Sequence, residues 1–357
     1  METSIKEFLG TKDLTLAEVM NRISINRKGC LYILGSRKQL CGSISDGDIR
    51  RWIMKTGNLN GTAADIMNKN PITLTITDKT LAPRLMQKAS IRSVPIVDDD
   101  RKVLDIVFLD DFRHRSRKNH SLANVPIIIM AGGKGTRLYP YTKILPKPLI
   151  PIGDIPILER IINRFCDYGA GEFYITINYK KEMIKSYFND INPAYKIHYV
   201  EENKPLGTAG SISLIDDKLN GPVIVTNCDI LIDTDYKALL QSHLDSGNAM
   251  TIVASVQNTV IPYGVIQTSS DGVIDRIDEK PKLSYLINTG MYIIDAKYLN
   301  LIPQNTFFHM TDLISKMQKE NIKVGSYPVG EGSFLDMGQF EELKKMEDRI
   351  TGGDIVE

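Results

Sequence analysis

A segment rich in glycine and cations, AGGKGTRLYPYTKILPKPLIPI, begins at Ala131 and offers the clearest chemistry in the chain. Glycines let the backbone approach an anionic ligand, so that its N–H groups can point at phosphate oxygens. The guanidinium of Arg137 adds charge where a polyphosphate would lie, and prolines on both sides of Lys147 fix the backbone that carries this second cation. The candidate nucleotide-binding and catalytic residues here are Ala131, Gly132, Gly133, Gly135, Thr136, Arg137 and Lys147.

The spacing of this segment excludes two common phosphate-binding motifs. The Walker pattern G-x-x-x-x-G-K-[ST] is absent. A dinucleotide fingerprint is excluded as well, because Arg-Leu-Tyr-Pro stands where a helix should start. The plain alternative is a glycine-rich turn with surface cations.

Two aspartates are candidate ligands of a divalent cation. Asp229 follows an apolar run, VIVTNC, which predicts a buried strand and leaves the carboxylate at its rim. Asp336, in SFLDMG, follows a second short strand, although taken alone it would more often be a helix N-cap. A hard cation with phosphate ligands needs only one or two carboxylates, and this favours Mg²⁺ at the pair.

Strands and helices alternate around these residues. We expect strands at 125–130, 172–178, 196–200, 222–226 and 249–256, and helices at 157–168, 180–188, 236–246 and 339–350. This order predicts an α/β fold whose mostly parallel, Rossmann-like sheet has helices on both faces. Ligands bind such sheets beyond the carboxyl ends of the strands, so one cleft could hold Arg137 and Asp229.

The segment from Ala131 resembles, nearly residue for residue, the signature of sugar-1-phosphate nucleotidyltransferases, and the resemblance extends from about Val125 to about Ile350. It implies the nucleotidyltransferase fold, transfer of a nucleotidyl group to a sugar 1-phosphate, and Mg²⁺ at Asp229 and Asp336. It also implies that Arg137 serves the leaving pyrophosphate while Lys147 and Lys280 hold phosphates. The sugar-phosphate-binding residues that it implies are Tyr263, Gly264, Glu279, Lys280, Asn288 and Thr289. A hairpin turn and a surface charge pair are the plain alternatives for the first four.

Glu202 favours GTP as the nucleotide. Related thymidylyl-type enzymes carry Gln at this position, whereas a carboxylate has only acceptors, which match the two adjacent donors on the edge of guanine. Gly207 and Thr208 are expected at a helix N-terminus, where free N–H groups can bind an anion or a base. One departure concerns Gln-Asn-Thr-Phe-Phe, residues 304–308, which replaces a run containing a phosphate-binding arginine in the thymidylyl branch.

Residues 1–112 contain an internal repeat. Leu34 to Ile49 aligns with Val97 to Phe112 at a fixed offset, and each unit reads as strand, turn, strand, and then an Asp that opens a helix. The pair resembles a tandem CBS module, an α+β pair that binds adenine nucleotides or related ligands. The resemblance implies ligand contacts from Ser45, Asp48 and Asp111. The second unit departs from the pattern at Asp105 and Phe108, and a purely structural, dimer-forming pair is the alternative.

The expected domains are a regulatory CBS pair at 1–112, a basic linker at 113–124 and a catalytic domain at 125–357. A net charge of +1 over 357 residues argues against a nucleic-acid or membrane-surface partner. No apolar run approaches the roughly 20 residues that span a bilayer, and the N-terminus lacks a secretory apolar region. The four cysteines form no metal-binding spacing, and reduced thiols in a cytoplasm are expected. Homo-oligomers are expected to form through the CBS pair.

A CBS pair ahead of a transferase without hexapeptide repeats resembles the guanylyltransferases of bacterial legionaminic acid biosynthesis, which serve flagellin glycosylation. The sugar substrate of those enzymes is glucosamine 1-phosphate. The ligand of the CBS pair would be an adenine nucleotide or a product of the pathway. Two alternatives stay open: transfer to mannose or heptose 1-phosphate, and a sensor that binds nucleotide sugar without turnover. The presence of all four residues Arg137, Lys147, Asp229 and Asp336 favours an enzyme.

Overall fold

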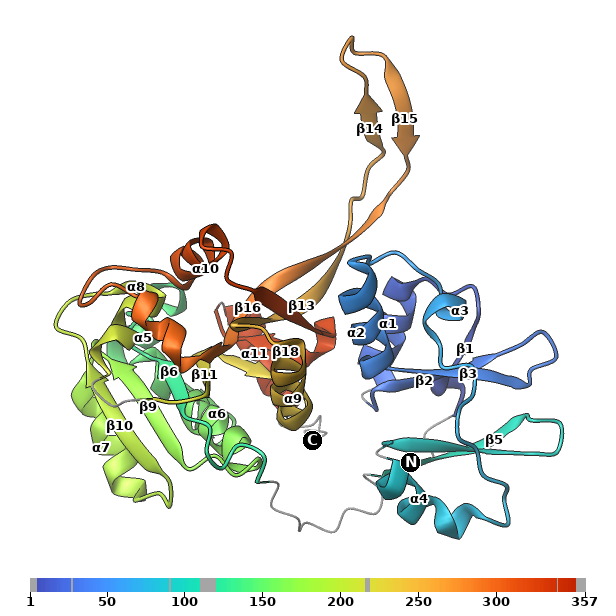
Figure 1. Ribbon diagram of the computed structural model, residues 1–357, viewed down its shortest axis with the longest axis horizontal. Helices are drawn as coiled ribbons and strands as arrows, with labels where there is room; N and C mark the ends of the chain where they lie inside the picture. Colours follow the sequence, from blue (N-terminus) through green and yellow to red (C-terminus); the bar gives the residue numbers. More distant parts are fainter. Residues whose placement is uncertain are drawn as a thin grey trace. The chain divides into compact units, whose positions relative to one another are not determined.

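The computed structural model describes residues 5–26, 28–89, 91–109, 120–215, 219–338 and 340–350, and it divides into two compact units. The first unit comprises Met1–Ser116, Ser255–Ile287 and Pro328–Ser333, and the second comprises Arg117–Ala254, Asn288–Tyr327 and Phe334–Glu357. Each unit has a hydrophobic core of its own. Figure 1 labels their helices and strands.

The first unit is built from two similar hairpins. β2 (Cys30–Leu34) pairs with β3 (Leu40–Ser45), and β4 (Ser93–Val97) pairs with β5 (Val103–Phe108), both antiparallel. The two hairpins have the same register: Cys30 pairs with Ser45 in the first, and the equivalent residues Ser93 and Phe108 pair in the second. The register also shifts at equivalent positions, after Ile33 in the first hairpin and after Ile96 in the second. The predicted repeat is therefore confirmed as a repeat of strand register.

The other elements of this unit complete the two halves. They are η1 (Ile5–Phe8), β1 (Leu9–Thr11), α1 (Leu16–Asn26), α2 (Asp46–Thr56), α3 (Ala63–Ile66), η2 (Lys79–Leu81), α4 (Ala82–Ala89) and η8 (Glu331–Ser333). One apolar cluster joins Cys30 and Tyr32 of the first hairpin to Val97 and Phe108 of the second, so the hairpins share a core.

The expectation that Asp48 opens a helix is wrong by two residues. α2 begins at Asp46 and has Ser45 as its N-cap, because the Ser45 hydroxyl accepts the N–H of Asp48. The equivalent Asp111 lies outside the described residues.

A further hairpin belongs to the first unit. β14 (Val265–Thr268) and β15 (Ile274–Asp278) pair antiparallel with each other in a two-stranded sheet. Ile266 lies opposite Ile277, and both are more than half exposed, whereas Gln267 and Arg276 are opposite each other on the next position. One face of this hairpin is therefore apolar and the other is polar.

A seven-stranded sheet of order β10-β9-β6-β11-β16-β13-β17 organises the second unit, and part of each of β16, β13 and β17 belongs to the residues of the first unit. Its strands are β10 (Lys196–Glu201), β9 (Glu172–Ile177), β6 (Ile127–Met130), β11 (Pro222–Asn227), β16 (Lys282–Asp295), β13 (Met250–Val260) and β17 (Val324–Val329). The first four are parallel, as Figure 1 also shows, and β16 runs antiparallel to β11. The sheet is thus mixed, and the predicted parallel order holds for one half of it.

Both faces of this sheet are covered. In β6, Ile127, Ile128 and Ile129 are all fully buried, although successive side chains point to opposite faces. Ile128 joins a cluster with Ala209, Ile212, Met310 and Leu313, which brings the segment after β10 and the helix α10 onto one face. The predicted α/β fold with helices packed on a central sheet is confirmed.

The remaining elements of the second unit are short turns of helix and the covering helices. They are η4 (Thr136–Leu138), α5 (Tyr141–Ile144), η5 (Lys147–Leu149), β7 (Pro151–Ile152), β8 (Ile155–Pro156), α6 (Ile157–Cys166), α7 (Lys181–Ile191), α8 (Gly207–Gly210), η6 (Ser211–Leu214), β12 (Ile230–Ile232), α9 (Tyr236–Ser246), η7 (Ala296–Leu301), α10 (Met310–Lys319), β18 (Phe334–Asp336) and α11 (Phe340–Ile350).

The linker expected at 113–124 lies partly outside the described residues. Its described end, from His120, contains a turn in which Leu122 is fully buried and donates its N–H to the Tyr168 carbonyl at 2.9 Å. These last residues are thus packed in the second unit. Within the described ranges, no helix has the length and apolar character that crossing a membrane requires.

Candidate active site

Two short strands bring the carboxylates of Asp229 and Asp336 together. β12 and β18 pair so that Ile230 lies opposite Asp336, and the Met337 N–H donates to the Asp229 carbonyl at 2.8 Å. The Lys147 ammonium donates to the Asp229 carboxylate, and these two side chains are only 11% and 12% exposed. Residues far apart in the sequence thus form one cluster of charges, and all of it belongs to the second unit.

Asp336 is the unusual member of this cluster. Its Oδ1 is buried and has no hydrogen-bond partner among the described residues. Burial raises the pKa of its carboxyl, and the nearby charge of Asp229 raises it further, while Lys147, a hydrogen bond from the Gly338 N–H and Arg137 act in the opposite direction. An unpartnered acceptor beside a second carboxylate costs free energy that a bound cation would remove.

The donor set of this cluster fits Mg²⁺. Two oxygen-bearing carboxylates suit a hard cation that completes its shell with waters and phosphate oxygens. No group of three or more His, Cys, Asp or Glu side chains with metal-binding geometry occurs in the described part of the chain. Two carboxylates leave coordination positions for water and phosphate oxygens, as a cation that arrives with a phosphate ligand requires.

The glycine-rich segment lies against this cluster. Gly135 has a left-handed backbone (φ 64°), and a Cβ at this position would lie 2.9 Å from the Cβ of Lys147. Only glycine therefore allows both the turn and the approach to Lys147. Arg137 is exposed on η4, and its charge reaches Asp336.

The remaining residues of the segment divide into anchors and exposed positions. Ala131 is 1% exposed and donates its N–H to the Thr176 carbonyl at 3.0 Å, so this N–H is used within the sheet. Gly133 and Thr136 are exposed, and a Cβ on Gly133 would meet no atom within 4 Å. The segment thus presents its glycine backbone to solvent.

Glu202 reaches under the same segment. It is 7% exposed, its Oε2 accepts the N–H of Leu206 at 3.3 Å, and a Cβ on Gly132 would overlap its Oε1. Burial raises the pKa of the Glu202 carboxyl, while the Leu206 N–H and the hydroxyls of Ser211 and Thr176 act to lower it. Sequence reasoning identified Glu202 but not the buried hydroxyls around it.

The helix expected after Leu206 is only four residues long. The N–H groups of Ala209 and Gly210 both donate to the Phe308 carbonyl at 3.0 Å, so within the described residues they are not available to a ligand. Gly207 has φ 79°, and a Cβ there would lie 2.6 Å from the same carbonyl. The chain around Phe308 therefore lies against the predicted nucleotide-binding residue Gly207, and the only sequence signal for it was the departure at residues 304–308.

The sequence-predicted sugar residues of the second unit are engaged within the sheet. Thr289 is 3% exposed and donates its hydroxyl to the Val253 carbonyl at 2.7 Å. Asn288 is exposed and donates to the Tyr292 hydroxyl at 2.8 Å. A Cβ on Gly290, in the interior of β16, would overlap the amide of Asn227, the last residue of β11.

The other sugar residues belong to the first unit. Tyr263 is 75% exposed, and a Cβ on Gly264 would lie 3.0 Å from the Glu279 carboxylate, so Gly264 and Glu279 are neighbours. Lys280 has φ 46°, which is unusual for a residue without a glycine's freedom and more so before a proline. Such outliers cluster at ligand-binding positions.

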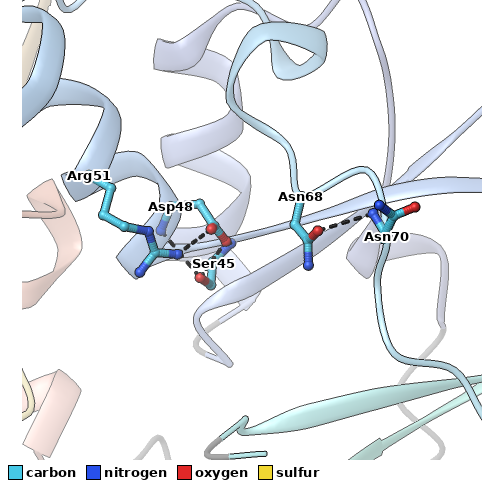
Figure 2. Close-up of polar contacts among 5 residues, drawn as sticks. All are labelled: Ser45, Asp48, Arg51, Asn68 and Asn70. Carbon is cyan, nitrogen blue, oxygen red and sulfur yellow. Dashed lines mark hydrogen bonds and ion pairs between the residues drawn. The ribbon is translucent and has the colours of Figure 1, made fainter.

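Ser45 and Asp48 form a capping box at the start of α2 (Figure 2). The Ser45 N–H and hydroxyl donate to Asp48 Oδ2 at 2.9 and 2.6 Å, and Arg51 donates to Oδ1. The separate pair of Asn68 and Asn70 closes a local turn. Both Asp48 oxygens therefore have protein partners.

Comparison with known proteins assigns the two parts of the chain separately. Residues 127–352 match the family described as Nucleotidyl transferase, and residues 63–118 match the CBS domain. The mannose-1-phosphate guanyltransferase of Saccharomyces cerevisiae is 31% identical over 59% of this chain and 61% of its own length. The bifunctional protein GlmU of Methanococcus aeolicus is 32% identical over 56% of this chain and 49% of its own length.

A solved structure gives the same result. The crystal structure of HddC from Yersinia pseudotuberculosis superposes with a TM-score of 0.50 and 28% identity, and it covers 63% of this chain and 99% of its own. The chain spans less than two thirds of the length of the two curated relatives. Because the match at 127–352 contains the charged cluster and the glycine-rich segment, the chain belongs to the nucleotidyl transferase family.

Proposed function

We propose that the protein transfers a guanylyl group from GTP to a sugar 1-phosphate, giving a GDP-sugar and pyrophosphate. An oxygen of the sugar phosphate attacks the α-phosphorus of GTP, and the bond from that phosphorus to the bridging oxygen of the leaving pyrophosphate breaks. The observation that carries this proposal is the cluster of Lys147, Asp229 and Asp336, with its unpartnered carboxylate oxygen.

The chemistry needs charge and position more than a nucleophile from the protein. A phosphate monoester is already an adequate nucleophile, so the barrier comes from bringing two anions together in line. Lys147, held rigidly beside Asp229, would bind the reacting phosphates, and exposed Arg137 would bind the leaving pyrophosphate. Lys280 and Glu279 would bind the phosphate and hydroxyls of the sugar, and the other proposed sugar contacts are Tyr263, Gly264, Asn288 and Thr289.

Asp229 and Asp336 would hold Mg²⁺. When bound, the ion neutralises charge on the phosphates. The protein's own contribution is to fix the two carboxylates through the β12–β18 pairing, and to keep Lys147 within reach of the same phosphates.

Selection of guanine would rest on Glu202. Its carboxylate lies against Gly132 and has acceptor capacity for two adjacent donors on a purine edge. Gly207 and Thr208 would provide backbone contacts to the nucleotide. The names of the curated guanyltransferase relatives support the same nucleotide class.

The finer proposal is that glucosamine 1-phosphate is converted to GDP-glucosamine in legionaminic acid biosynthesis, in the cytoplasm. The order of a CBS match at residues 63–118 and a nucleotidyl transferase match at residues 127–352 supports it, and all four cysteines are free. Mannose 1-phosphate is the second candidate, because several relatives carry the name mannose-1-phosphate guanyltransferase.

The decisive experiment measures pyrophosphate release with Mg²⁺, crossing four nucleoside triphosphates against the 1-phosphates of glucosamine, mannose and glucose. Strong turnover only with GTP and glucosamine 1-phosphate is expected. Turnover with GTP and mannose 1-phosphate would show that mannose 1-phosphate, and not glucosamine 1-phosphate, is the sugar substrate. Absence of turnover with every pair would favour a sensor of nucleotide sugars.

We further propose that the first unit regulates the reaction and mediates homo-oligomers, with an adenine nucleotide or a pathway product as its ligand. Ser45 and Asp48 could bind such a ligand only by exchanging contacts of their capping box. Calorimetric titration of the full chain with AMP, ATP and GDP-sugars tests this proposal. If none of these ligands gives a heat of binding, the first unit has a structural and not a ligand-binding role.

A further inference from the structure

The segment from Gln304 to His309 is hydrogen-bonded to residues 206–210, which follow Glu202 in the chain. The Phe308 N–H donates to the Leu206 carbonyl at 2.9 Å, and the Met310 N–H donates to the Thr208 hydroxyl at 3.0 Å. A Cβ on Gly210 would overlap the Thr306 carbonyl, so this close approach requires glycine. The position of residues 306–309 is therefore fixed by the same residues that are proposed to contact the nucleotide.

Alternation along this extended segment sends neighbouring side chains in opposite directions. Phe308 is half-buried and packs on the core beside the sheet. Phe307 and His309, on either side of it, are exposed, and Phe307 retains 58% of its surface. Their rings contact each other edge to face, with centroids 4.7 Å apart and planes at 82°.

The imidazole of His309 is held in one orientation. As the N-cap residue of α10, His309 donates its backbone N–H to Asp312 Oδ2 at 2.8 Å and accepts the Asp312 N–H at its carbonyl at 3.0 Å. Its Nδ1 lies 3.5 Å from the Thr208 hydroxyl. The Thr208 oxygen already accepts the Met310 N–H, so its hydroxyl hydrogen is placed to donate to Nδ1, and the neutral ring then carries its proton on Nε2. Within the described residues no partner of Nε2 is found, so this N–H is a donor available to a ligand.

A continuous set of contacts connects this ring pair to the base-reading carboxylate. Gly132 lies against Glu202, Glu202 accepts the N–H of Leu206, and Leu206 and Gly207 contact Phe308. A nucleoside with its base at Glu202 would thus extend toward Phe307 and His309. None of the proposed sugar-binding residues makes a described contact with either ring.

We propose that Phe307 and His309 form the outer wall of the nucleoside pocket and determine the preference for a purine. The ring of Phe307 offers a π surface to the base, and His309 donates from Nε2 to a ribose or phosphate oxygen. A purine covers more of an aromatic surface than a pyrimidine does, so the wall favours GTP over UTP. This inference rests on the proposed guanylyl transfer.

The test compares Phe307→Ala with Leu244→Ala, an exposed apolar residue of α9 that serves as control. Phe307→Ala should raise the KM for GTP about 10-fold and reduce the preference for GTP over UTP by a similar factor, with the KM for sugar 1-phosphate unchanged. Leu244→Ala should change neither. A higher KM for the sugar phosphate instead, or an unchanged KM for GTP, would overturn the proposal.

His309→Asn separates ligand binding from helix capping, because Asn is a good N-cap but lacks the imidazole. It should raise the KM for GTP several-fold while the melting temperature stays unchanged. If the wild-type chain shows no turnover with any substrate pair, the proposed function fails, and calorimetric binding of GTP and UTP to the same variants still decides the role of the wall. Equal GTP affinity of wild type and both ring variants would refute it.

Discussion

Two carboxylates, Asp48 in the first turn of α2 and Asp336 at the end of β18, differ in how many of their oxygens have hydrogen-bond partners. Asp48 accepts from the Ser45 N–H, the Ser45 hydroxyl and Arg51, so both of its oxygens have partners. Asp336 keeps a buried oxygen without a partner in the described residues, beside the charge of Asp229. The first arrangement stabilises the N-terminus of a helix. In the second, a buried acceptor without a hydrogen-bond partner costs free energy, and a bound cation would remove that cost.

A position in a family pattern does not by itself assign a role to a residue. Ser45 and Asp48 occupy positions where a CBS resemblance implies a ligand, yet their contacts satisfy each other. Asp336 alone would more often be read as a helix cap, yet α11 begins only at Phe340. The satisfaction of each polar atom separates the two cases.

The largest expected effect follows from Asp229→Asn. We expect turnover to fall by about 1,000-fold, because the change removes a charge opposite Lys147 and one of the two cation ligands. Pyrophosphate release measures the loss, and circular dichroism checks that the fold persists. Activity near the wild-type level would contradict the assignment of the cluster.

A smaller effect is expected for Glu202→Gln. The amide keeps an acceptor for the Leu206 N–H but presents a donor to guanine, so kcat/KM for GTP should fall about 100-fold. Kinetics with four nucleoside triphosphates test this expectation. If the variant prefers GTP over the other nucleoside triphosphates as strongly as the wild type does, residues other than Glu202 recognise the base.

Asp336→Asn should stabilise the metal-free protein by about 1 kcal/mol, because it removes a buried charge next to Asp229. Since the folded pKa of Asp336 is raised, the wild type binds more protons when folded, and its stability falls as pH rises through that pKa. The variant should lack this part of the pH dependence. Melting curves from pH 4 to 8, without Mg²⁺, compare the two, and identical pH profiles would argue against a strained carboxylate.

Addition of Mg²⁺ with GTP provides the control for that comparison. Ligand binding should raise the melting temperature of the wild type and should raise that of Asp336→Asn much less. Equal shifts in both proteins would mean that Asp336 does not hold the cation.

The smallest effect is expected for Asp48→Ala. Loss of the capping box should destabilise the first unit by about 1 kcal/mol and leave turnover unchanged in the absence of effectors. Ser45→Ala is the matched variant, since it removes the other half of the same box. Calorimetric unfolding measures both, and a large loss of activity in either would give this end of α2 a role beyond structure.

The sequence was most informative where function is carried by consecutive residues. The glycine-rich segment, with Arg137 and Lys147, was recognisable because backbone approach and fixed cations require particular residues at short spacing. The repeat in the first unit was visible for the same reason, as each hairpin needs the same pattern of apolar residues and turn. The strands of the second unit were predicted to within a few residues of β6, β9, β10 and β11.

Other features depended on contacts between distant segments. Whether an aspartate caps a helix or faces a second carboxylate is decided by the pairing of β12 with β18, which no local pattern specifies. The antiparallel β16 in the sheet and the fastening of Phe308 to Leu206 are likewise long-range hydrogen bonds. The family segment and the repeat can be predicted from the sequence because both are local patterns. Which polar atoms have hydrogen-bond partners follows only from the tertiary structure, because those partners lie far away in the chain.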